Sequence, residues 1–306
     1  MKYGLRILAL LVLVSLTVLT LAQEDTAELI SNVDERIDSY TSFAIDHVTE
    51  EIQSTEIVLE GESFEQSFRV IREYNGTITR GDNPSAAVTM TVSVEESAGT
   101  DSVAYAIEAE LRYVDGALYV NAAYTEGAED ALPLPEGWVQ TDVESFEFFD
   151  LDLPGFVELI VPSEETPGVL DDLEAVLEQA TAINTTTEER ETETLTVTEV
   201  LFGPDGVTAL LSAGGENDIE NDPIAQLILE QLQDVDDLVA IIIAQDDTDN
   251  VRERTISLNL DLNEIDGTTF GQPGSIISLN VSNLISEEFT QIGESFPTVE
   301  APAVNG

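Results

Sequence analysis

The chain has 306 residues, of which 62 are acidic and 10 are basic, so its net charge at pH 7 is −52. It has no cysteine, a single histidine (His47) and a single lysine (Lys2). This inventory excludes a thiolate nucleophile, a Cys/His zinc cage and, beyond the first residues, a Schiff-base or P-loop lysine. So acidic a surface also disfavours nucleic acid and anionic lipid head groups as partners.

Residues 1–22 have the features of a secretory signal peptide. Lys2 and Arg6 form a basic start, residues 7–21 are mostly apolar, and small residues ending at Ala22 offer a cleavage site. The apolar run is shorter than the roughly 20 residues of a spanning helix, although an uncleaved signal anchor is the competing interpretation. We therefore expect a secreted or periplasmic protein of the cell envelope, with no membrane span after cleavage of the leader.

The first elements expected after the leader are a helix and then strands. Residues 26–39 have helical periodicity behind a capping Asp25, and the period changes to two after Tyr40. Apolar residues that indicate two strands are Phe43, Ile45, Ile57 and Leu59, and then Phe64, Phe68, Val70 and Tyr74. Asn75-Gly76 predicts a turn after the second of these strands.

Residues 86–142 give the clearest pattern, an antiparallel meander. Asp115-Gly116 is a strong hairpin signal between two of its strands. The alternating apolar positions are Val88, Met90, Val92 and Val94; Val103, Tyr105, Ile107, Ala109, Leu111 and Tyr113; and Leu118, Val120 and Ala122. One face of this meander is apolar and the other polar, so the apolar face needs a covering layer or a ligand.

The rest of the chain mixes helices and strands. Amphipathic helices are expected over 166–180 and 222–235, each opened by a proline at its first position. Further strands are expected over 195–202 and 207–211, joined by a turn at Asp205-Gly206, and over 238–244, 252–262 and 276–283. An acidic connection spans 142–165 and a frayed tail spans 297–306. This order predicts an α+β fold with a single domain over residues 23–296.

Several short segments of the chain resemble the bacterial lipoprotein-carrier superfamily that includes LolA, LolB and the LppX/LprG-type lipoproteins. The segments are Ile37-Asp38-Ser39-Tyr40 after the leader, Val114-Asp115-Gly116-Ala117-Leu118-Tyr119-Val120 followed by Leu134-Pro135-Glu136-Gly137-Trp138-Val139, and Ser282-Asn283 before Val299-Glu300-Ala301-Pro302. The resemblance covers most of the chain after residue 22.

The resemblance implies a strongly curved antiparallel sheet that forms an incomplete, half-open β-barrel. An N-terminal helix and two or more inserted amphipathic helices would cover its open side and leave an apolar cavity for acyl chains. This chain departs from the lipoprotein members because it lacks the acylated cysteine, which favours a diffusible carrier. Such families share no catalytic constellation, so the resemblance transfers no catalytic residue.

The candidate ligand-binding residues are those that would line such a cavity: Met90, Tyr105, Ile107, Leu111, Tyr113, Leu118, Val120 and Trp138. A plain sheet–helix core would show the same pattern, and Trp138 could either pack in that core or stack on a ligand. The partner expected is a lipid or other apolar small molecule, with no cofactor. The alternative is a non-enzymatic structural, adhesion or weak calcium-binding module of the cell surface with a fully packed core.

Catalytic and metal-binding interpretations find less support in the sequence. His47 stands alone, and Gly61-Glu62-Ser63 and Gly293-Glu294-Ser295 each lack the second glycine of a nucleophile elbow. A calcium loop at residues 261–272 has Ile265 where a ligand is needed. Acidic turns at 246–250 and 218–222 suit solvated turns better than weak divalent-cation sites. We therefore expect no enzymatic activity.

The dispersed carboxylates predict that salt stabilises the fold. Repulsion among them destabilises the compact state, and added salt screens it. The thermal midpoint, measured by circular dichroism, should rise as NaCl is increased. A midpoint that is indifferent to salt would contradict the repulsion argument.

Overall fold

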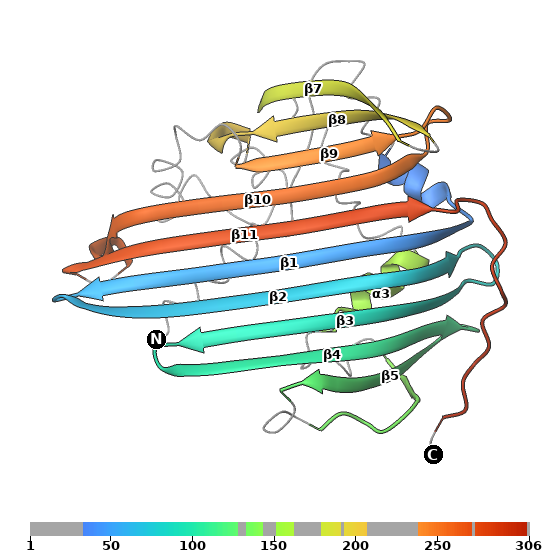
Figure 1. Ribbon diagram of the computed structural model, residues 1–306, viewed down its shortest axis with the longest axis horizontal. Coiled ribbons are helices and arrows are strands. Elements are labelled where there is room, and N and C mark those ends of the chain that lie inside the picture. Colours follow the sequence, from blue (N-terminus) through green and yellow to red (C-terminus); the bar gives the residue numbers. More distant parts are fainter. Residues whose placement is uncertain are drawn as a thin grey trace. The chain divides into compact units, whose positions relative to one another are not determined.

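The computed structural model describes residues 33–127, 133–142, 151–161, 179–190, 193–206, 238–270 and 273–304. Their strands form an 11-stranded sheet in the order β6-β5-β4-β3-β2-β1-β11-β10-β9-β8-β7 (Figure 1). The strands are β1 Ser42–Leu59, β2 Glu62–Thr79, β3 Ser85–Ala98, β4 Asp101–Val114, β5 Ala117–Glu126, β6 Val139–Thr141, β7 Ala180–Glu189, β8 Thr194–Phe202, β9 Val239–Gln245, β10 Val251–Asp266 and β11 Ser275–Thr290. The order is two meanders, β1–β6 and β7–β11, with the first and last strands as neighbours.

The chain divides into two compact units, and β1, β2 and β11 have residues in both. The first unit contains Met1–Ile37, Ile52–Ser67 and Pro167–Leu284. The second contains Asp38–Glu51, Phe68–Thr166 and Ile285–Gly306.

The antiparallel meander of the second unit is confirmed. Leu111 pairs with Val88 on β3 and with Val120 on β5, and Val120 in turn pairs with Val139 on β6. All but Val139 are buried. Asp115 and Gly116 form the β4–β5 turn, with φ of 54° and 76° respectively, as a two-residue hairpin turn requires.

The turn predicted at Asn75-Gly76 is wrong, because β2 continues to Thr79. A Cβ added to Gly76 would lie 2.6 Å from the Cα of Val88 and 2.9 Å from its Cγ2. Glycine is therefore needed here for the close approach of β3 rather than for a reversal of the chain. Residues 80–84 make the reversal instead.

A short helix lies inside the segment expected to be an acidic connection. Helix α3, Leu153–Ile160, is capped by Asp152, whose Oδ1 accepts a hydrogen bond of 3.0 Å from the backbone N–H of Gly155. Its apolar residues Leu153, Phe156 and Ile160 are buried. The signal in the sequence was a capping aspartate and an early proline before an apolar i, i+3, i+7 pattern.

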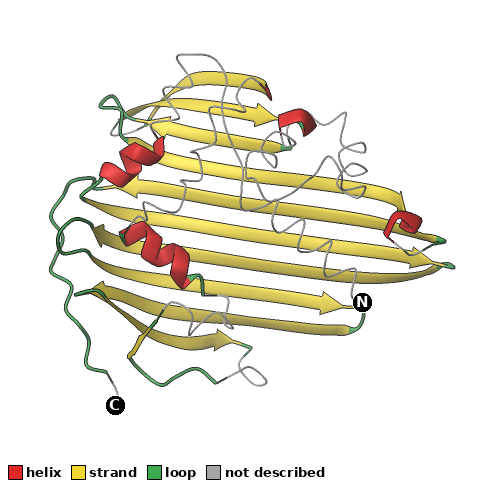
Figure 2. Cartoon of the chain, turned by 180° about the vertical axis from the view of Figure 1, so that it is seen from behind, coloured by secondary structure: helices red, strands yellow, loops and turns green. Residues whose placement is uncertain are grey.

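Helix α3 packs on one face of β2, and we call this side of the second unit the α3 face (Figure 2). The rings of Phe156 and Tyr74 stack with centroids 6.4 Å apart. The Tyr74 hydroxyl donates to the carbonyl of Asp152 at 3.0 Å, and Arg80 Nε donates to the carbonyl of Leu159 at 2.9 Å. Burial raises the pKa of the Tyr74 phenol, and Asp152 adds to the rise.

In the first unit, the strands expected over 195–202, 238–244, 252–262 and 276–283 correspond to β8, β9, β10 and β11. Strand β7 was not expected, because its threonine-rich sequence has little apolar alternation. Residues 204–206 are helical, so the hairpin turn predicted at Asp205-Gly206 is wrong.

Other expected elements fall wholly or partly outside the described residues. These are the leader, most of the helix over 166–180, the helix over 222–235 and the strand over 207–211. Of the N-terminal helix, residues 33–39 are described and are helical, with Val33 and Ile37 buried. No helix in the described ranges is long and apolar enough to cross a membrane.

Replacement of Gly76 tests the close approach of β2 and β3. We expect Gly76→Ala to lower the free energy of unfolding by about 2 kcal/mol, since the new methyl group overlaps the backbone of β3. Urea unfolding should show this loss, whereas Thr77→Ala at the next position should cost less. Equal costs for the two variants would contradict the steric argument.

Candidate functional site

The cross-strand register brings seven of the eight candidate residues onto the α3 face. Gly76 shares this face with Tyr74 by strand alternation. A Cβ added to Gly76 would meet the Val88 side chain, which places the even-numbered residues of β3 on this face too. Pairing of Met90 with Ala109 and of Val88 with Leu111 extends the face to β4, and from there to β5. The seven are Met90, Tyr105, Ile107, Leu111, Tyr113, Leu118 and Val120.

These seven residues differ in how far they are covered. Met90, Ile107, Leu111 and Val120 are fully buried, and Leu118 is nearly so. Tyr105 and Tyr113 are half-buried. Tyr105 meets Tyr124 of β5 edge-on, with ring centroids 6.0 Å apart. The two tyrosines therefore mark where the α3 face is still reachable from outside.

Trp138 does not join the other seven. It precedes Val139, which pairs with Val120 on the α3 face, so alternation directs Trp138 to the opposite face. There the guanidinium of Arg112 lies over its indole ring, 4.7 Å from the centroid. Arg112 Nη1 also donates to the carbonyl of Glu300 at 3.3 Å, which ties the expected tail to the end of β4. Trp138 thus contributes to a cation–π contact on the outer face.

A pair of ionisable side chains that the sequence did not bring together lies on the α3 face. His47 Nδ1 donates to Glu287 Oε1 at 3.2 Å, although the two residues are 240 positions apart. Their side chains are 13% and 3% exposed. The His47 ring also meets Tyr74 edge-on, with centroids 5.2 Å apart. A buried carboxylate requires such partners, and no pattern in the sequence predicts which strand supplies them.

Arg80 adds a covered cation to the same unit. Its side chain is 7% exposed, Nη1 lies 3.5 Å from Asp38 Oδ1, and the guanidinium stands 5.0 Å from the centre of the Phe43 ring. Burial lowers the pKa of Arg80, while Asp38 and Glu287 act in the opposite direction. The covered guanidinium of Arg80 therefore has a carboxylate beside it, and that carboxylate reaches solvent.

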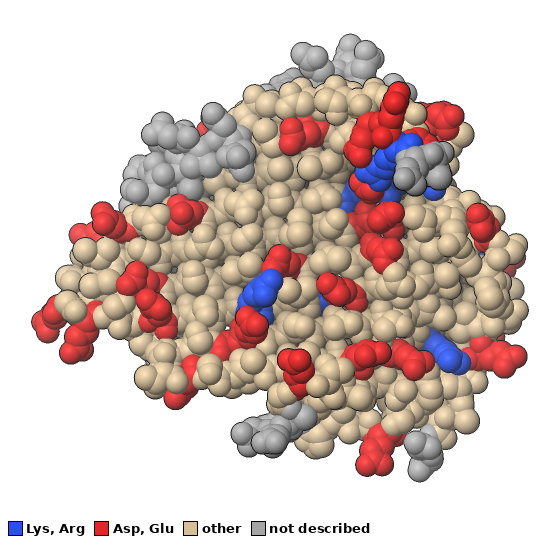
Figure 3. Space-filling view, in the orientation of Figure 1, with Lys and Arg blue, Asp and Glu red and all other residues tan. Residues whose placement is uncertain are grey.

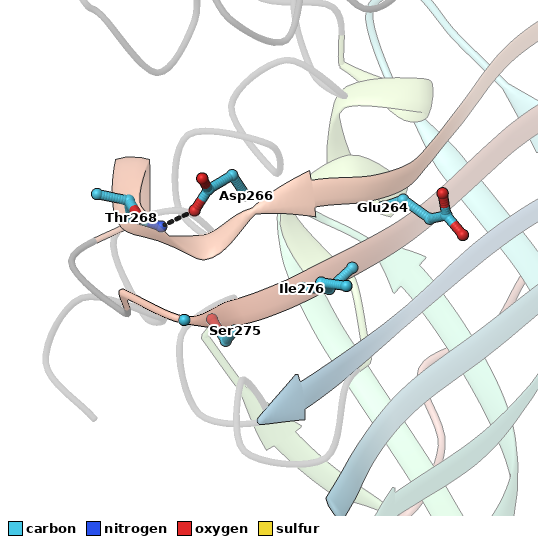
Figure 4. Close-up of a pocket in the computed structure, with 6 residues that line it drawn as sticks. Glu264, Asp266, Thr268, Ser275 and Ile276 are labelled. Carbon is cyan, nitrogen blue, oxygen red and sulfur yellow. Dashed lines mark hydrogen bonds between the residues drawn. The ribbon is translucent and has the colours of Figure 1, made fainter. Parts of the chain in front are cut away.

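A pocket of about 320 Å³ lies in the first unit, where β10 and β11 are joined (Figure 4). Its lining includes Glu264, Asp266, Thr268, Ser275 and Ile276. The backbone N–H of Thr268 donates to Asp266 Oδ1 at 2.8 Å, and hydrogen bonds from Thr268 lower the pKa of that carboxyl. Most of the lining residues are polar, and none of them is a candidate residue.

In the acidic turn expected at residues 246–250, the Asp246 carboxylate bonds to neighbouring residues of the chain. Asp246 Oδ1 accepts from the backbone N–H and the hydroxyl of Thr248 and from the backbone N–H of Asn250, and Oδ2 lies 2.9 Å from Arg252 Nε. Burial alone would raise the pKa of Asp246, but these hydrogen bonds lower it. Within the described ranges no three carboxylate or histidine side chains are placed to hold a metal ion. The second acidic turn, at 218–222, lies outside those ranges.

Acidic side chains are scattered over the face seen in Figure 3, and the basic residues there lie beside acidic ones. On the outer face of β1 and β2, Arg69 Nη2 donates to Glu50 Oε1 at 2.7 Å. The carboxylates do not gather into one patch for a basic partner on this face.

No model of a known protein family matches the chain, and no curated protein matches its sequence. Among solved structures, the lipoprotein LppX of Mycobacterium tuberculosis is 9% identical; the match covers 90% of this chain and 99% of that one, with a TM-score of 0.32. A DUF1329 family protein of Desulfovibrio piger is 10% identical over 88% and 92% of the two chains, with a TM-score of 0.14. A putative outer membrane lipoprotein-sorting protein domain of Vibrio parahaemolyticus is 10% identical over 88% and 93%, with a TM-score of 0.13.

Two of these three matches belong to the group that the sequence motifs resemble. All three TM-scores lie below 0.5, so the matches carry no argument about how this chain works.

A double-mutant cycle tests the His47–Glu287 pair. His47→Leu should lower the free energy of unfolding by about 3 kcal/mol, because it removes the ring nitrogen that is hydrogen-bonded to a covered carboxylate. The double variant His47→Leu/Glu287→Leu should lose less than that single variant, as measured by urea unfolding. Arg69→Leu, in the exposed pair with Glu50, is the control and should cost no more than about 1 kcal/mol. A double variant less stable than His47→Leu would contradict the pairing.

Proposed function

We propose that the protein is an exported, non-catalytic carrier that holds a lipid or other apolar ligand against the α3 face of β3, β4 and β5. The observation that carries the proposal is the continuous apolar face formed by the seven residues, with Tyr105 and Tyr113 still half-exposed at its margin. An apolar face of this kind can bury a hydrocarbon chain, and each buried methylene contributes about 0.8 kcal/mol to the free energy of binding.

The arrangement around His47 supports a role without catalysis. A general base needs a nucleophile or a substrate proton within reach of its free ring nitrogen, and among the described residues His47 is hydrogen-bonded to the Glu287 carboxylate and to no hydroxyl. The hydroxyl of Tyr74, whose ring contacts His47, donates to a backbone carbonyl. Export to the envelope rests on residues 1–22, whose composition supports it.

A structural module with a solid core is the second candidate function. It is favoured by the complete burial of Met90, Ile107, Leu111 and Val120 in the structure. A loaded carrier retains an apolar molecule when the protein is purified, whereas a protein with a solid core does not.

Native mass spectrometry of protein purified from its own cell envelope separates the two candidates. The carrier should retain an apolar molecule that organic solvent extracts and that can be loaded again from vesicles of neutral lipid. Protein that is always empty and takes up no lipid would overturn the carrier and leave the structural module.

A pair of tyrosine variants on one hairpin tests where the ligand lies. Tyr113→Glu puts a charge on the α3 face and should lower the retained ligand about fivefold or more, because a carboxylate is costly beside a hydrocarbon chain. Tyr119→Glu is the matched control. Tyr119 is equally half-buried but pairs with Arg112, on the outer face. Equal loss from both variants would count against the α3 face as the site.

A further inference from the structure

One buried hydroxyl on the α3 face has no partner among the described residues. The Oγ1 of Thr49 is buried and makes no hydrogen bond within the part of the chain that the structure describes. Alternation along β1 places Thr49 on the same face as Ile45 and His47. Buried polar atoms in folded proteins are almost always hydrogen-bonded, to protein or to ordered water, so this hydroxyl offers a hydrogen-bonding group to a bound molecule.

Thr49 lies beside the apolar face rather than within it. The hairpin at residues 80–84 makes β2 and β3 antiparallel, and Gly76 lies beside Val88. The same register places Tyr74 beside Met90, and Tyr74 contacts His47 on β1. The face is thus apolar on β3, and on β1 it changes from the buried Ile45 to the polar His47 and Thr49.

The polar end of this face is reachable from solvent. Arg72, which shares the face with Tyr74, donates from Nη1 to Glu51 Oε1 at 2.7 Å. The Glu51 side chain is 40% exposed, whereas that of Arg72 is 14% exposed. An amphiphile could therefore lay its chain along the apolar residues and keep its polar end near Thr49 and water.

The charges near Thr49 select the chemistry of that polar end. Each described arginine on this part of the face already has a carboxylate: Arg72 has Glu51 and Arg80 has Asp38, while the His47 ring is hydrogen-bonded to Glu287. An acidic head group would have to compete with these carboxylates for the cations, in a protein whose net charge is −52. A hydroxyl can donate and accept, so it can pair with Thr49 at no electrostatic cost.

We propose that Thr49 is the head-group contact of the carrier and that its ligands are uncharged amphiphiles with a hydroxyl-bearing polar end, of the monoacylglycerol class. The inference rests on the proposed carrier function and goes beyond it by specifying the ligand class. His47 and Tyr74 are positioning residues, because their contact holds the polar part of the α3 face beside Thr49 in place.

Displacement of Nile red, a neutral dye, from solvent-extracted protein tests the inference with three ligands of equal chain length: monolauroylglycerol, lauric acid and methyl laurate. The wild-type protein should bind monolauroylglycerol about tenfold more tightly than the other two, the equivalent of about 1.4 kcal/mol. Thr49→Val keeps the shape of the side chain but lacks the hydroxyl, and it should remove that preference. The matched control Thr77→Val changes a half-buried threonine on the outer face of β2 and should preserve it.

The outcomes separate the two proposals. If the dye and all three ligands fail to bind, the carrier function itself is wrong. If they bind but lauric acid or methyl laurate binds as tightly as monolauroylglycerol, the carrier stands and the head-group inference is overturned. This ranking in the wild-type protein is decisive even if Thr49→Val does not fold. A preference that survives in a folded Thr49→Val would also overturn the inference.

Discussion

An apolar sheet face cannot remain in water, and the described structure of the second unit is organised by that constraint. Strict alternation along β3, β4 and β5 collects valine, isoleucine, leucine and methionine on one side, and their pairing makes the side continuous. Helix α3 supplies part of the cover through Leu153, Phe156 and Ile160. In a solid core the rest of this face is covered by protein alone, whereas in a carrier it is covered by protein and ligand.

Polar groups on a covered face need partners, and the second unit supplies them in pairs. Glu287 is matched by His47, Arg80 by Asp38, and Arg72 by Glu51. These contacts join β1 to β2 and to β11, and join the residue after β2 to the end of the N-terminal helix, so they help to specify which elements are neighbours. The hydroxyl of Thr49 differs from these groups because no described residue matches it.

The three predicted turns show how much of the chain's path local sequence preferences determine. Three Asx-Gly dipeptides were each expected to reverse the chain, and only Asp115-Gly116 does so. Asn75-Gly76 stays in β2, where the long hydrogen-bonded ladder outweighs the preference of the dipeptide and β3 needs the space of a missing side chain. Asp205-Gly206 lies in a helical stretch. A turn preference is a local term, and the pairing of a whole strand exceeds it.

The shared face of most candidate residues follows from the sequence for the same reason. Seven of the eight residues lie on one face because alternation is a property of neighbouring positions in a strand. Trp138 was misplaced relative to them, since its side depends on the register between β6 and β5. Helix α3 and strand β7 were missed because one is short and the other has little apolar periodicity.

The sequence by itself determined which residues form the strands of the β3–β5 meander, which of their side chains share a face, and that the surface is acidic, because these follow from composition and from spacings of a few residues. Only the tertiary structure decided that Glu287 meets His47, that Arg112 covers Trp138 and that Thr49 is left without a partner among the described residues. The physical reason is that such contacts join residues on different strands. Strand order and register set those contacts, and they emerge only when the whole sheet assembles.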